Sequence, residues 1–158
     1  MNADPRVMEF FDAPLTREES DAKVGRIQQL FEERGFSMWA VELVGEAAFV
    51  GTIGLNIPNY DAHFTPCVEV GWRLAVEYWG RGIATEGARA ALEVGFRELD
   101  LLEIVSLTTV ANARSRRVME KLGMHCDPAD DFDHPALPAG HPLRRHVLYR
   151  IASPTREA

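Results

Sequence analysis

The stretch YWGRGIATEG at residues 78–87 has the residue types of an anion-binding turn. It stands between a strand-like run and a helix-like run, and a helix N-terminus offers unpaired N–H groups and the positive end of the helix dipole. Gly80 and Gly82 lack a Cβ atom, so phosphate oxygens can approach the main chain. Arg81 adds a positive charge and Thr85 a hydroxyl donor. An ordinary strand-to-helix turn explains the same residues equally well, so the stretch alone leaves both interpretations open.

The glycine spacing differs from two familiar phosphate-binding patterns. The sequence contains no GxxxxGK[ST] run, and the glycines of GRGIATEG do not fit GxGxxG. A nucleotide-binding regulatory domain that uses the same helix N-terminus stays open as one alternative.

Periodicity, capping and turn signals predict the elements around this stretch. Thr16 and Glu19 form a capping-box pattern that starts a helix ending near Gly35. Residues 36–43 and 47–55 form two strand-like runs joined as a hairpin. The remaining elements follow in order: a strand at 67–76, a helix to about Leu99 with a face of small residues, a strand at 103–110, a helix at 112–123, a loop at 127–142 and a strand at 143–151. This order indicates a mixed α/β or α+β fold.

Composition excludes several classes of protein. A chain of 158 residues predicts one domain, residues 1–158, in which 152–158 form a tail. The net charge of −7 argues against a broad nucleic-acid-binding surface. Two cysteines cannot make a disulfide framework. The sequence has neither a signal peptide nor an apolar stretch of about 18 residues, which predicts a cytoplasmic protein without a membrane partner.

The runs VGWRL…YWGRGIATEGARAAL and NARSRRVMEKLGM resemble the GCN5-related N-acetyltransferases (GNAT), in particular the ribosomal-protein-alanine acetyltransferases. The family pattern [Q/R]-x-x-G-x-[G/A] is matched at residues 79–84, with Trp79 in place of the first Gln or Arg. That departure is common in this branch. The resemblance is specific over 68–124 and weaker over 2–149. It implies the GNAT fold: a mixed, mostly antiparallel sheet flanked by helices, with two splayed parallel strands, here 68–74 and 103–110.

The resemblance also implies a site for acetyl-CoA, used as co-substrate without a metal. The N–H groups of the glycine-rich turn would hold the pyrophosphate, the main chain of the strand before it the pantetheine arm, and the start of the next helix would add polar contacts. These residues are Trp72, Leu74, Gly80, Arg81, Gly82, Ile83, Ala84, Thr85, Asn112 and Ser115. Asn112 also fits an ordinary helix N-cap, and both roles are compatible.

Acetyl transfer to an amine requires a neutral amine, a polarised carbonyl and a proton for the departing thiolate. By resemblance, Glu69 is the candidate general base, acting through water; the alternatives are a solvated strand residue or a partner for Arg73. Ser115 stands where many members carry a residue that protonates the thiolate, and an exposed helix serine is the alternative.

The acceptor site is the least specified part of the sequence. His63, Phe64 and Cys67 precede the Glu69 strand and are candidates for its border. The loop at 127–142 is rich in aspartate, which favours either a solvated loop or a cover that attracts a cationic amine. The His, Cys and Asp residues at 125–134 fit neither paired CxxC ligands nor an EF-hand, so we expect no metal.

Members of this branch usually have a strand and a helix before the segment NADPRVMEFF, which here directly follows Met1. We therefore expect an unpaired edge on the hairpin at 36–55, which either lowers stability or is covered by a second chain in a homodimer. The sequence as a whole predicts an acetyl-CoA-dependent N-acetyltransferase that acetylates a primary amine, of a protein N-terminus or a small molecule, by direct attack in a ternary complex. The alternative is a non-catalytic acyl-CoA-binding or regulatory module.

Overall fold

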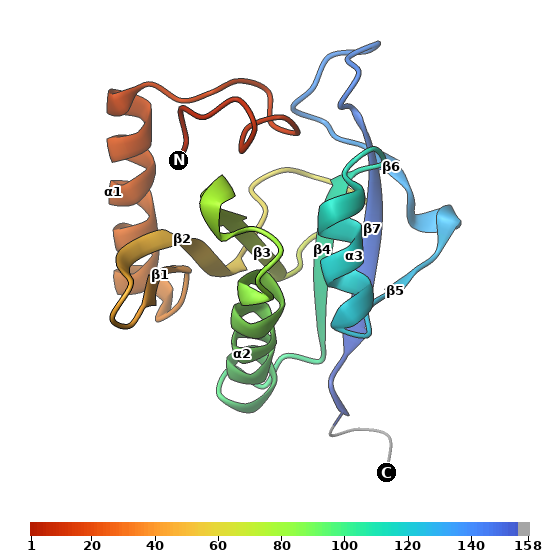
Figure 1. Cartoon of the computed structure of the whole chain (residues 1–158). Helices are drawn as coiled ribbons and strands as arrows, with labels where there is room; N and C mark the ends of the chain where they lie inside the picture. The colour runs from red at the N-terminus through yellow and green to blue at the C-terminus, as the bar shows by residue number, and fades with distance from the viewer. Residues whose placement is uncertain (155–158) are drawn as a thin grey trace.

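A seven-stranded mixed sheet forms the centre of the computed structural model, which describes residues 1–154 (Figure 1). The elements, in chain order, are α1 (Arg17–Arg34), β1 (Met38–Leu43), β2 (Ala47–Asn56), β3 (Glu69–Leu74), a 3₁₀ turn (Val76–Tyr78), α2 (Ile83–Arg97), β4 (Glu103–Thr109), α3 (Ala113–Lys121), β5 (His125–Cys126), a 3₁₀ turn (Pro128–Asp130), β6 (Phe132–Asp133) and β7 (Arg145–Ala152). The strand order is β1-β2-β3-β4-β7-β5, and β6 also pairs with β7. The predicted mixed α/β fold is confirmed.

The two central strands, β3 and β4, are parallel and meet only where β3 begins. Glu69 is in register with Val105, and the Val105 N–H donates to the Val68 carbonyl at 2.9 Å. The buried Ser106 hydroxyl donates to the Val70 carbonyl at 2.9 Å. No further ladder pair joins these strands within residues 1–154, so they diverge beyond Val70. The predicted splay is confirmed.

Helix α2 packs closely on one face of the sheet because its inner face is built from small residues. An added Cβ atom on Gly95 would lie 2.5 Å from the Ile104 Cδ1 atom, and one on Gly87 would lie 2.6 Å from Ile53 Cδ1. Ala88 and the other small residues of this face are buried against strands β2, β3 and β4. Helices α2 and α3 lie side by side on this face (Figure 1).

Helix α1 lies apart from α2 and α3, beside the β1–β2 hairpin (Figure 1). The predicted capping box is present: the Glu19 N–H donates to Thr16 Oγ1 at 3.2 Å, and the Thr16 N–H donates to the Glu19 carboxylate at 2.8 Å. Gly35 ends the helix in the left-handed conformation, as predicted. None of the α1 residues is buried, and its best-defined ring contact joins Phe31 to Trp39 at 5.7 Å between centroids. This helix is therefore the least tightly packed of the three.

The ends of the sheet bear on two further predictions. Strand β1 has one partner, β2, and forms an edge of the sheet, as expected for the hairpin. Strand β7 continues to Ala152, and the Ser153 N–H donates to the Leu102 carbonyl at 2.9 Å, so the predicted tail at 152–158 starts too early. Its residues 155–158 lie outside the described part of the chain. Among residues 1–154, no helix is long and apolar enough to cross a membrane.

Candidate active site

The glycine-rich stretch forms an N–H cradle at the start of α2. Gly80 and Gly82 adopt left-handed backbone conformations with φ of 72° and 86°, and Gly82 is the N-cap. The Glu86 N–H donates to the Gly82 carbonyl at 3.0 Å, which leaves the first three N–H groups of the helix without an intrahelical acceptor. These three donors belong to Ile83, Ala84 and Thr85. The cradle therefore presents N–H groups and the positive helix end to an anion.

Arg81, assigned to the same anion, already has a carboxylate partner. Its guanidinium makes two hydrogen bonds to Glu46, at 2.6 and 2.7 Å, and both side chains are exposed. Glu46 belongs to the turn of the β1–β2 hairpin. Arg81 thus ties the cradle to the hairpin, and its charge is shared with this exposed pair.

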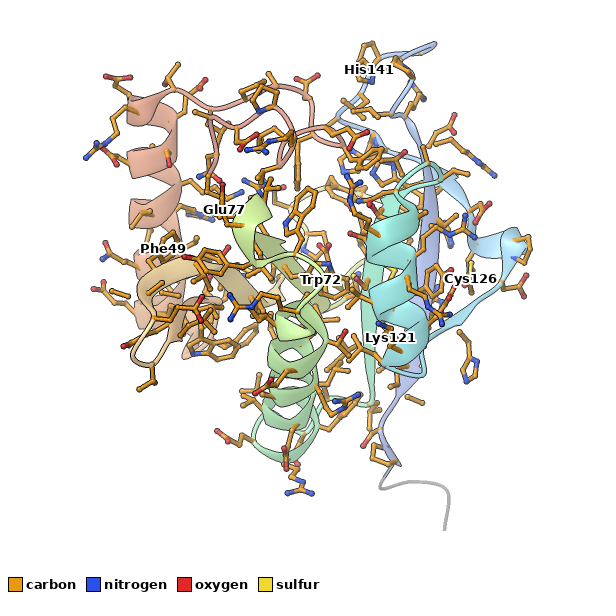
Figure 2. The ribbon with its side chains drawn as sticks, in the orientation of Figure 1. Phe49, Trp72, Glu77, Lys121, Cys126 and His141 are labelled. Carbon is orange, nitrogen blue, oxygen red and sulfur yellow. The ribbon has the colours of Figure 1, made fainter. Side chains whose placement is uncertain are left out.

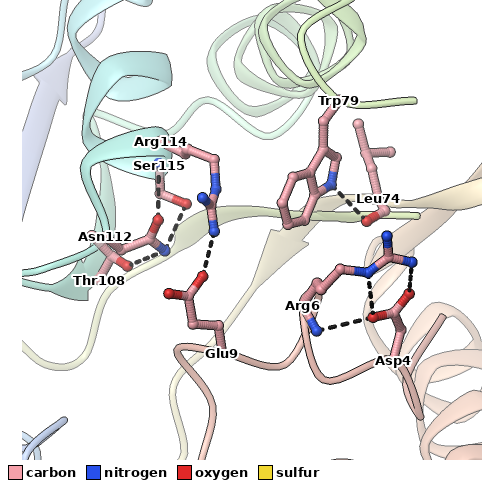
Figure 3. A network of polar contacts seen from close by, with 9 residues as sticks. All are labelled: Asp4, Arg6, Glu9, Leu74, Trp79, Thr108, Asn112, Arg114 and Ser115. Atoms are coloured by element: carbon pink, nitrogen blue, oxygen red, sulfur yellow. Dashed lines mark hydrogen bonds and ion pairs between the residues drawn. The ribbon is translucent and has the colours of Figure 1, made fainter. Parts of the chain in front are cut away.

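Trp79, where the family pattern has Gln or Arg, closes the turn before the cradle. Its indole Nε1 donates to the Leu74 carbonyl at 2.9 Å (Figure 3). The guanidinium of Arg114 lies 4.6 Å from the Trp79 ring centroid and makes a 2.6 Å ion pair with Glu9. The Leu74 carbonyl therefore already has a donor, whereas the sequence assigned the main chain there to the pantetheine arm. Arg114 and Glu9 are not predicted as site residues from the sequence. The arginine-rich start of NARSRR is the signal that could have indicated Arg114.

Trp79, Arg114 and Glu9 border an open cavity of about 460 Å³ between the N-terminal segment and the start of α3. Pro5 and Arg6 complete its lining. Trp72, the other aromatic residue of this strand end, lies between α2 and α3 (Figure 2). The cavity and the cradle both adjoin the turn after β3, since Trp79 lines the cavity and directly precedes Gly80 of the cradle.

Asn112 is the N-cap of α3, as one of its two predicted roles requires. Its Oδ1 accepts from the Ser115 N–H at 3.2 Å, and its Nδ2 donates to Thr108 Oγ1 at 3.0 Å and to Ser115 Oγ at 3.1 Å (Figure 3). Ser115 is half-buried, and its own hydroxyl proton remains available for donation. The structure thus brings Asn112 and Ser115 into one polar cluster.

Glu69 lies on the face of the sheet opposite to α2 and α3, which is the face toward α1. The pKa of its carboxyl is raised to about 7, chiefly by burial, while a hydrogen bond from Asn56 and the charge of Lys23 act in the other direction. A carboxyl with this pKa can accept a proton near neutral pH. Within residues 1–154 Glu69 makes no ion pair with Arg73, so the proposed pairing of these two residues is wrong. Arg73 instead donates to Asn2 Oδ1 at 3.1 Å and lies 3.9 Å from the Phe11 ring centroid.

The loop before β3 adds two titratable groups near Glu69. The Tyr60 hydroxyl is buried without a hydrogen-bond partner among the described residues, and burial together with the Glu69 charge raises its pKa well above the usual range. Burial and Glu69 also raise the pKa of the Cys67 thiol to about 11. Cys67 therefore stays protonated at neutral pH and is a poor nucleophile.

The other border candidates have structural partners. Phe64 is buried in a second core cluster with Val105, Phe132 and Leu148. His63 lies 3.4 Å from the Asp130 carboxylate. Each of these contacts joins the loop before β3 to the loop at 127–142.

Two of the four aspartates of the 127–142 loop pair with arginines of β7 and of the segment before it. Asp130 pairs with Arg150 at 2.6 Å, and Asp133 lies 3.2 Å from Arg144 and 3.4 Å from Arg145. Asp127 and Asp131 make no ion pair among the described residues, so the loop keeps part of its negative charge. Among residues 1–154, no group of three or more His, Cys, Asp or Glu side chains is arranged to hold a metal ion.

Comparison with known proteins agrees with this geometry. The model of the acetyltransferase (GNAT) domain family matches residues 1–125 of the chain. The chain belongs to the GNAT acetyltransferase family. As a GNAT protein it is an acyltransferase, and enzymes of this family use acetyl-CoA as the acetyl donor.

Several relatives and solved structures are similar to this GNAT protein. YkkB of Bacillus subtilis is 33% identical over 122 residues, which cover 77% of the chain and 70% of YkkB. The FsC-acetyl coenzyme A-N(2)-transacetylase of Aspergillus fumigatus is 32% identical over 131 residues, but the chain covers only 55% of that enzyme. A GNAT acetyltransferase structure from Bacillus anthracis superposes with a TM-score of 0.76 at 27% identity, covering 96% of this chain and 84% of that one.

One further structure is a match of fold alone. Spermidine N-acetyltransferase from Vibrio cholerae, solved with CoA and spermine, has a TM-score of 0.71 at 18% identity, over 96% of this chain and 85% of that one. The predicted GNAT fold is confirmed by these neighbours.

Proposed function

We propose that the protein transfers the acetyl group of acetyl-CoA to a primary amine, by direct attack of the amine in a ternary complex. The observation that carries the proposal is the splay of β3 and β4, which opens at Val70 beside Glu69. The N–H cradle lies at the other end of β3, at the start of α2. A thioester bound between these strands would lie between the anion cradle, which follows the end of β3, and the candidate base Glu69, which stands at its start.

The cradle residues fit a pyrophosphate group. Three unpaired N–H groups and a helix dipole provide the attraction, and two glycines leave the main chain open, since no atom lies within 4 Å of a Cβ built on either. Acetyl-CoA, when bound, supplies an activated thioester carbonyl. The protein orients it, and Arg114 with Trp79 borders the approach.

The two proton transfers fall to side chains on opposite faces of the sheet. Glu69, with a pKa near 7, takes the proton of the acceptor ammonium or amine, directly or through water. Ser115, held by Asn112 at 3.1 Å, donates a proton to the departing thiolate. This separation favours simultaneous binding of both substrates, and the protonated Cys67 thiol argues against an acetyl-cysteine step.

The acceptor is a protein N-terminal amine or a small amine, and the printed names of the relatives include acetyltransferases of small molecules. We further propose a homodimer in which a second chain covers the free edge of β1. The cytoplasmic location and the absence of nucleic-acid partners stay predictions. Sedimentation tests the dimer: a stable monomer at micromolar concentration would contradict it.

Two measurements test the proposed function. Acetyl-CoA is expected to raise the melting temperature, whereas ATP at the same concentration is not, because the cavity and the splay suit an extended pantetheine arm. A thiol-release assay over a panel of amines is then expected to show amine-dependent turnover. Binding of acetyl-CoA without turnover on any amine would favour the non-catalytic acyl-CoA-binding module instead.

A further inference from the structure

Two cationic side chains line a pocket on the α1 face, the same face as Glu69. The pocket has a volume of about 160 Å³ and lies between the N-terminal segment, α1 and the strands β2 and β3. Lys23 reaches it from α1 and Arg73 from β3. Its polar lining is completed by Asn2, Ser20 and Thr52, and none of its lining residues is a carboxylate.

Neither cation has a carboxylate within 4.0 Å in the part of the chain that the structure describes. Arg73 makes one hydrogen bond, to the Asn2 side chain, and stacks on the Phe11 ring. A guanidinium carries five N–H donors, so donors remain for a ligand. Other arginines of the chain do pair with carboxylates: Arg6, Arg17, Arg81, Arg97, Arg114, Arg117, Arg144, Arg145 and Arg150.

The electrostatics of the pocket favour an anion. Burial lowers the pKa of Lys23 to about 8, and the Arg73 charge acts in the same direction, although Lys23 as a whole residue stays exposed. Burial also lowers the pKa of Arg73, to about 10, so both groups are predominantly cationic at neutral pH. Glu69 is the acidic group that interacts with Lys23, and it is itself half-neutral near pH 7. Two adjacent, partly desolvated cations without a full counter-charge are stabilised when an anion binds between them.

We infer that this pocket binds a carboxylate of the acceptor, so that the acetyl acceptor is a small primary amine that also bears a carboxylate group. Arg73 and Lys23 are the specificity-determining residues. A planar guanidinium binds a carboxylate through two parallel hydrogen bonds, and Lys23 adds a second charge. No carboxylate of the 127–142 loop lines this pocket, and Asp130 and Asp133 of that loop are paired with arginines.

The amine of such an acceptor would extend along β3 from the pocket toward Glu69, which does not itself line the pocket. Glu69 and Arg73 lie four residues apart on one face of the strand, so their Cα atoms are separated by about 13 Å. An acceptor that contacts both groups therefore has its amine and its carboxylate several bonds apart. This inference rests on the proposed acetyltransferase activity and narrows its substrate class.

Matched pairs of acceptors test the inference. The carboxylate members are glycine, β-alanine, 4-aminobutyrate and 6-aminohexanoate, each paired with its amide, and spermidine is added as a polycationic amine. We expect kcat/KM to be at least about tenfold higher for one or more carboxylate members than for the matching amide, as for a hydrogen bond to a charged group. Equal or better turnover of the amides or of spermidine would overturn the inference and leave the proposed acetyl transfer intact.

Two variants and two controls assign the preference to the pocket. Arg73→Gln and Lys23→Met are expected to raise KM for the carboxylate member and reduce the pair ratio to near one, with KM for acetyl-CoA unchanged. Arg89→Gln on α2 and Lys121→Met on α3 remove exposed charges far from the pocket and are expected to keep the ratio. A ratio that survives both pocket variants would overturn the assignment.

A binding measurement separates failure of the inference from failure of the proposed function. If acetyl-CoA binds but no amine releases thiol, 4-aminobutyrate and its amide are titrated calorimetrically into the CoA-saturated protein. Carboxylate-dependent binding that Arg73→Gln abolishes would support the pocket assignment even though the acetyl transfer had failed. Absent binding, or binding that the variant does not change, would overturn it.

Discussion

Replacing Glu69 by glutamine tests the proposed base through both stability and rate. The structure raises the pKa of this carboxyl from the usual 4.5 to about 7, mainly because the group is buried. The folded protein therefore binds a proton more tightly at this site than the unfolded chain does. Stability is complete below about pH 4.5 and falls as the pH rises through 7, since the charged form must then be kept in the buried site.

The size of this effect follows from the shift. A difference of about 2.5 pKa units at about 1.4 kcal/mol each corresponds to about 3.5 kcal/mol of unfolding free energy, as an upper value for a half-buried residue that is not fully reached at pH 8. Glu69→Gln removes the charge and keeps the shape, so we expect the variant to equal the wild type at pH 4.5 and to be up to about 3 kcal/mol more stable at pH 8. Urea unfolding at both pH values measures the difference.

Glu69→Gln should lower turnover, although it raises stability above neutral pH. The wild-type kcat/KM for the amine is expected to rise with pH with an apparent pKa near 7, since Glu69 must be deprotonated to act, although Lys23, Tyr60 and Cys67 interact with it and shape the profile. Glu69→Gln should lose about 10²-fold or more in kcat and keep its affinity for acetyl-CoA.

Glu42→Gln on the exposed strand β1 is the matched control and should change neither quantity. A variant with wild-type kcat at saturating amine, or one that gains no stability between pH 4.5 and 8, would refute the assignment of Glu69 as a buried base.

Three further substitutions test the cradle and the packing beneath it. Gly82→Val forces a β-branched residue into a left-handed backbone and should weaken acetyl-CoA binding at least about tenfold in calorimetry. The control Gly45→Val, equally left-handed but in the hairpin turn, should lower stability by about 1–2 kcal/mol and leave binding unchanged. Equal effects of the two variants on binding would contradict the assignment of the cradle. Trp79→Phe keeps an aromatic side chain but loses the second ring of the indole and its 2.9 Å hydrogen bond to the β3 carbonyl, and should lower stability by at least about 1 kcal/mol in urea unfolding; an unchanged midpoint would show that the bond contributes nothing. Gly95→Ala places a methyl group 2.5 Å from an isoleucine of β4 and should cost about 1–3 kcal/mol, whereas Gly25→Ala, in open space on α1, should be neutral or stabilising by up to about 1 kcal/mol; the reverse order would contradict the close packing of α2.

The coenzyme half of the site was accessible from the sequence because its signals are local. Two glycines separated by one residue, before a helix with a face of small residues, predict both the cradle and the close approach of α2, and Gly95 against Ile104 shows why no larger residue fits. The N-cap role of Asn112 also depends on residues within one helical turn. The role of Trp79 was harder to predict. Its hydrogen bond to Leu74 and its contact with Arg114 depend on the tertiary fold, and no periodic pattern in the sequence indicates them.

The acceptor half depends on tertiary contacts that the sequence does not encode in any spacing. Glu69 and Arg73 share one strand face, and their opposite charges suggested a pair, but about 13 Å of strand separates their Cα atoms and Arg73 turns to Asn2 and Phe11. Lys23 joins this face from α1, a helix without one buried residue. The aspartate-rich loop allowed either a solvated loop or a cover over a cationic acceptor, and two of its four aspartates pair with arginines of β7 and of the segment before it.

The difference in packing between α2 and α1 explains how the choice of acceptor can be independent of the coenzyme site. The cradle is built on α2, which cannot move away from the sheet without breaking close contacts at Gly87 and Gly95. The cationic pocket is built partly on α1, whose position is set by few apolar contacts and by a capping box at one end. Substitutions on α1 therefore alter the charge next to Glu69 at little cost in stability and without disturbing the coenzyme cradle. The acceptor specificity of this protein should accordingly respond to changes at Lys23 far more than its affinity for acetyl-CoA does.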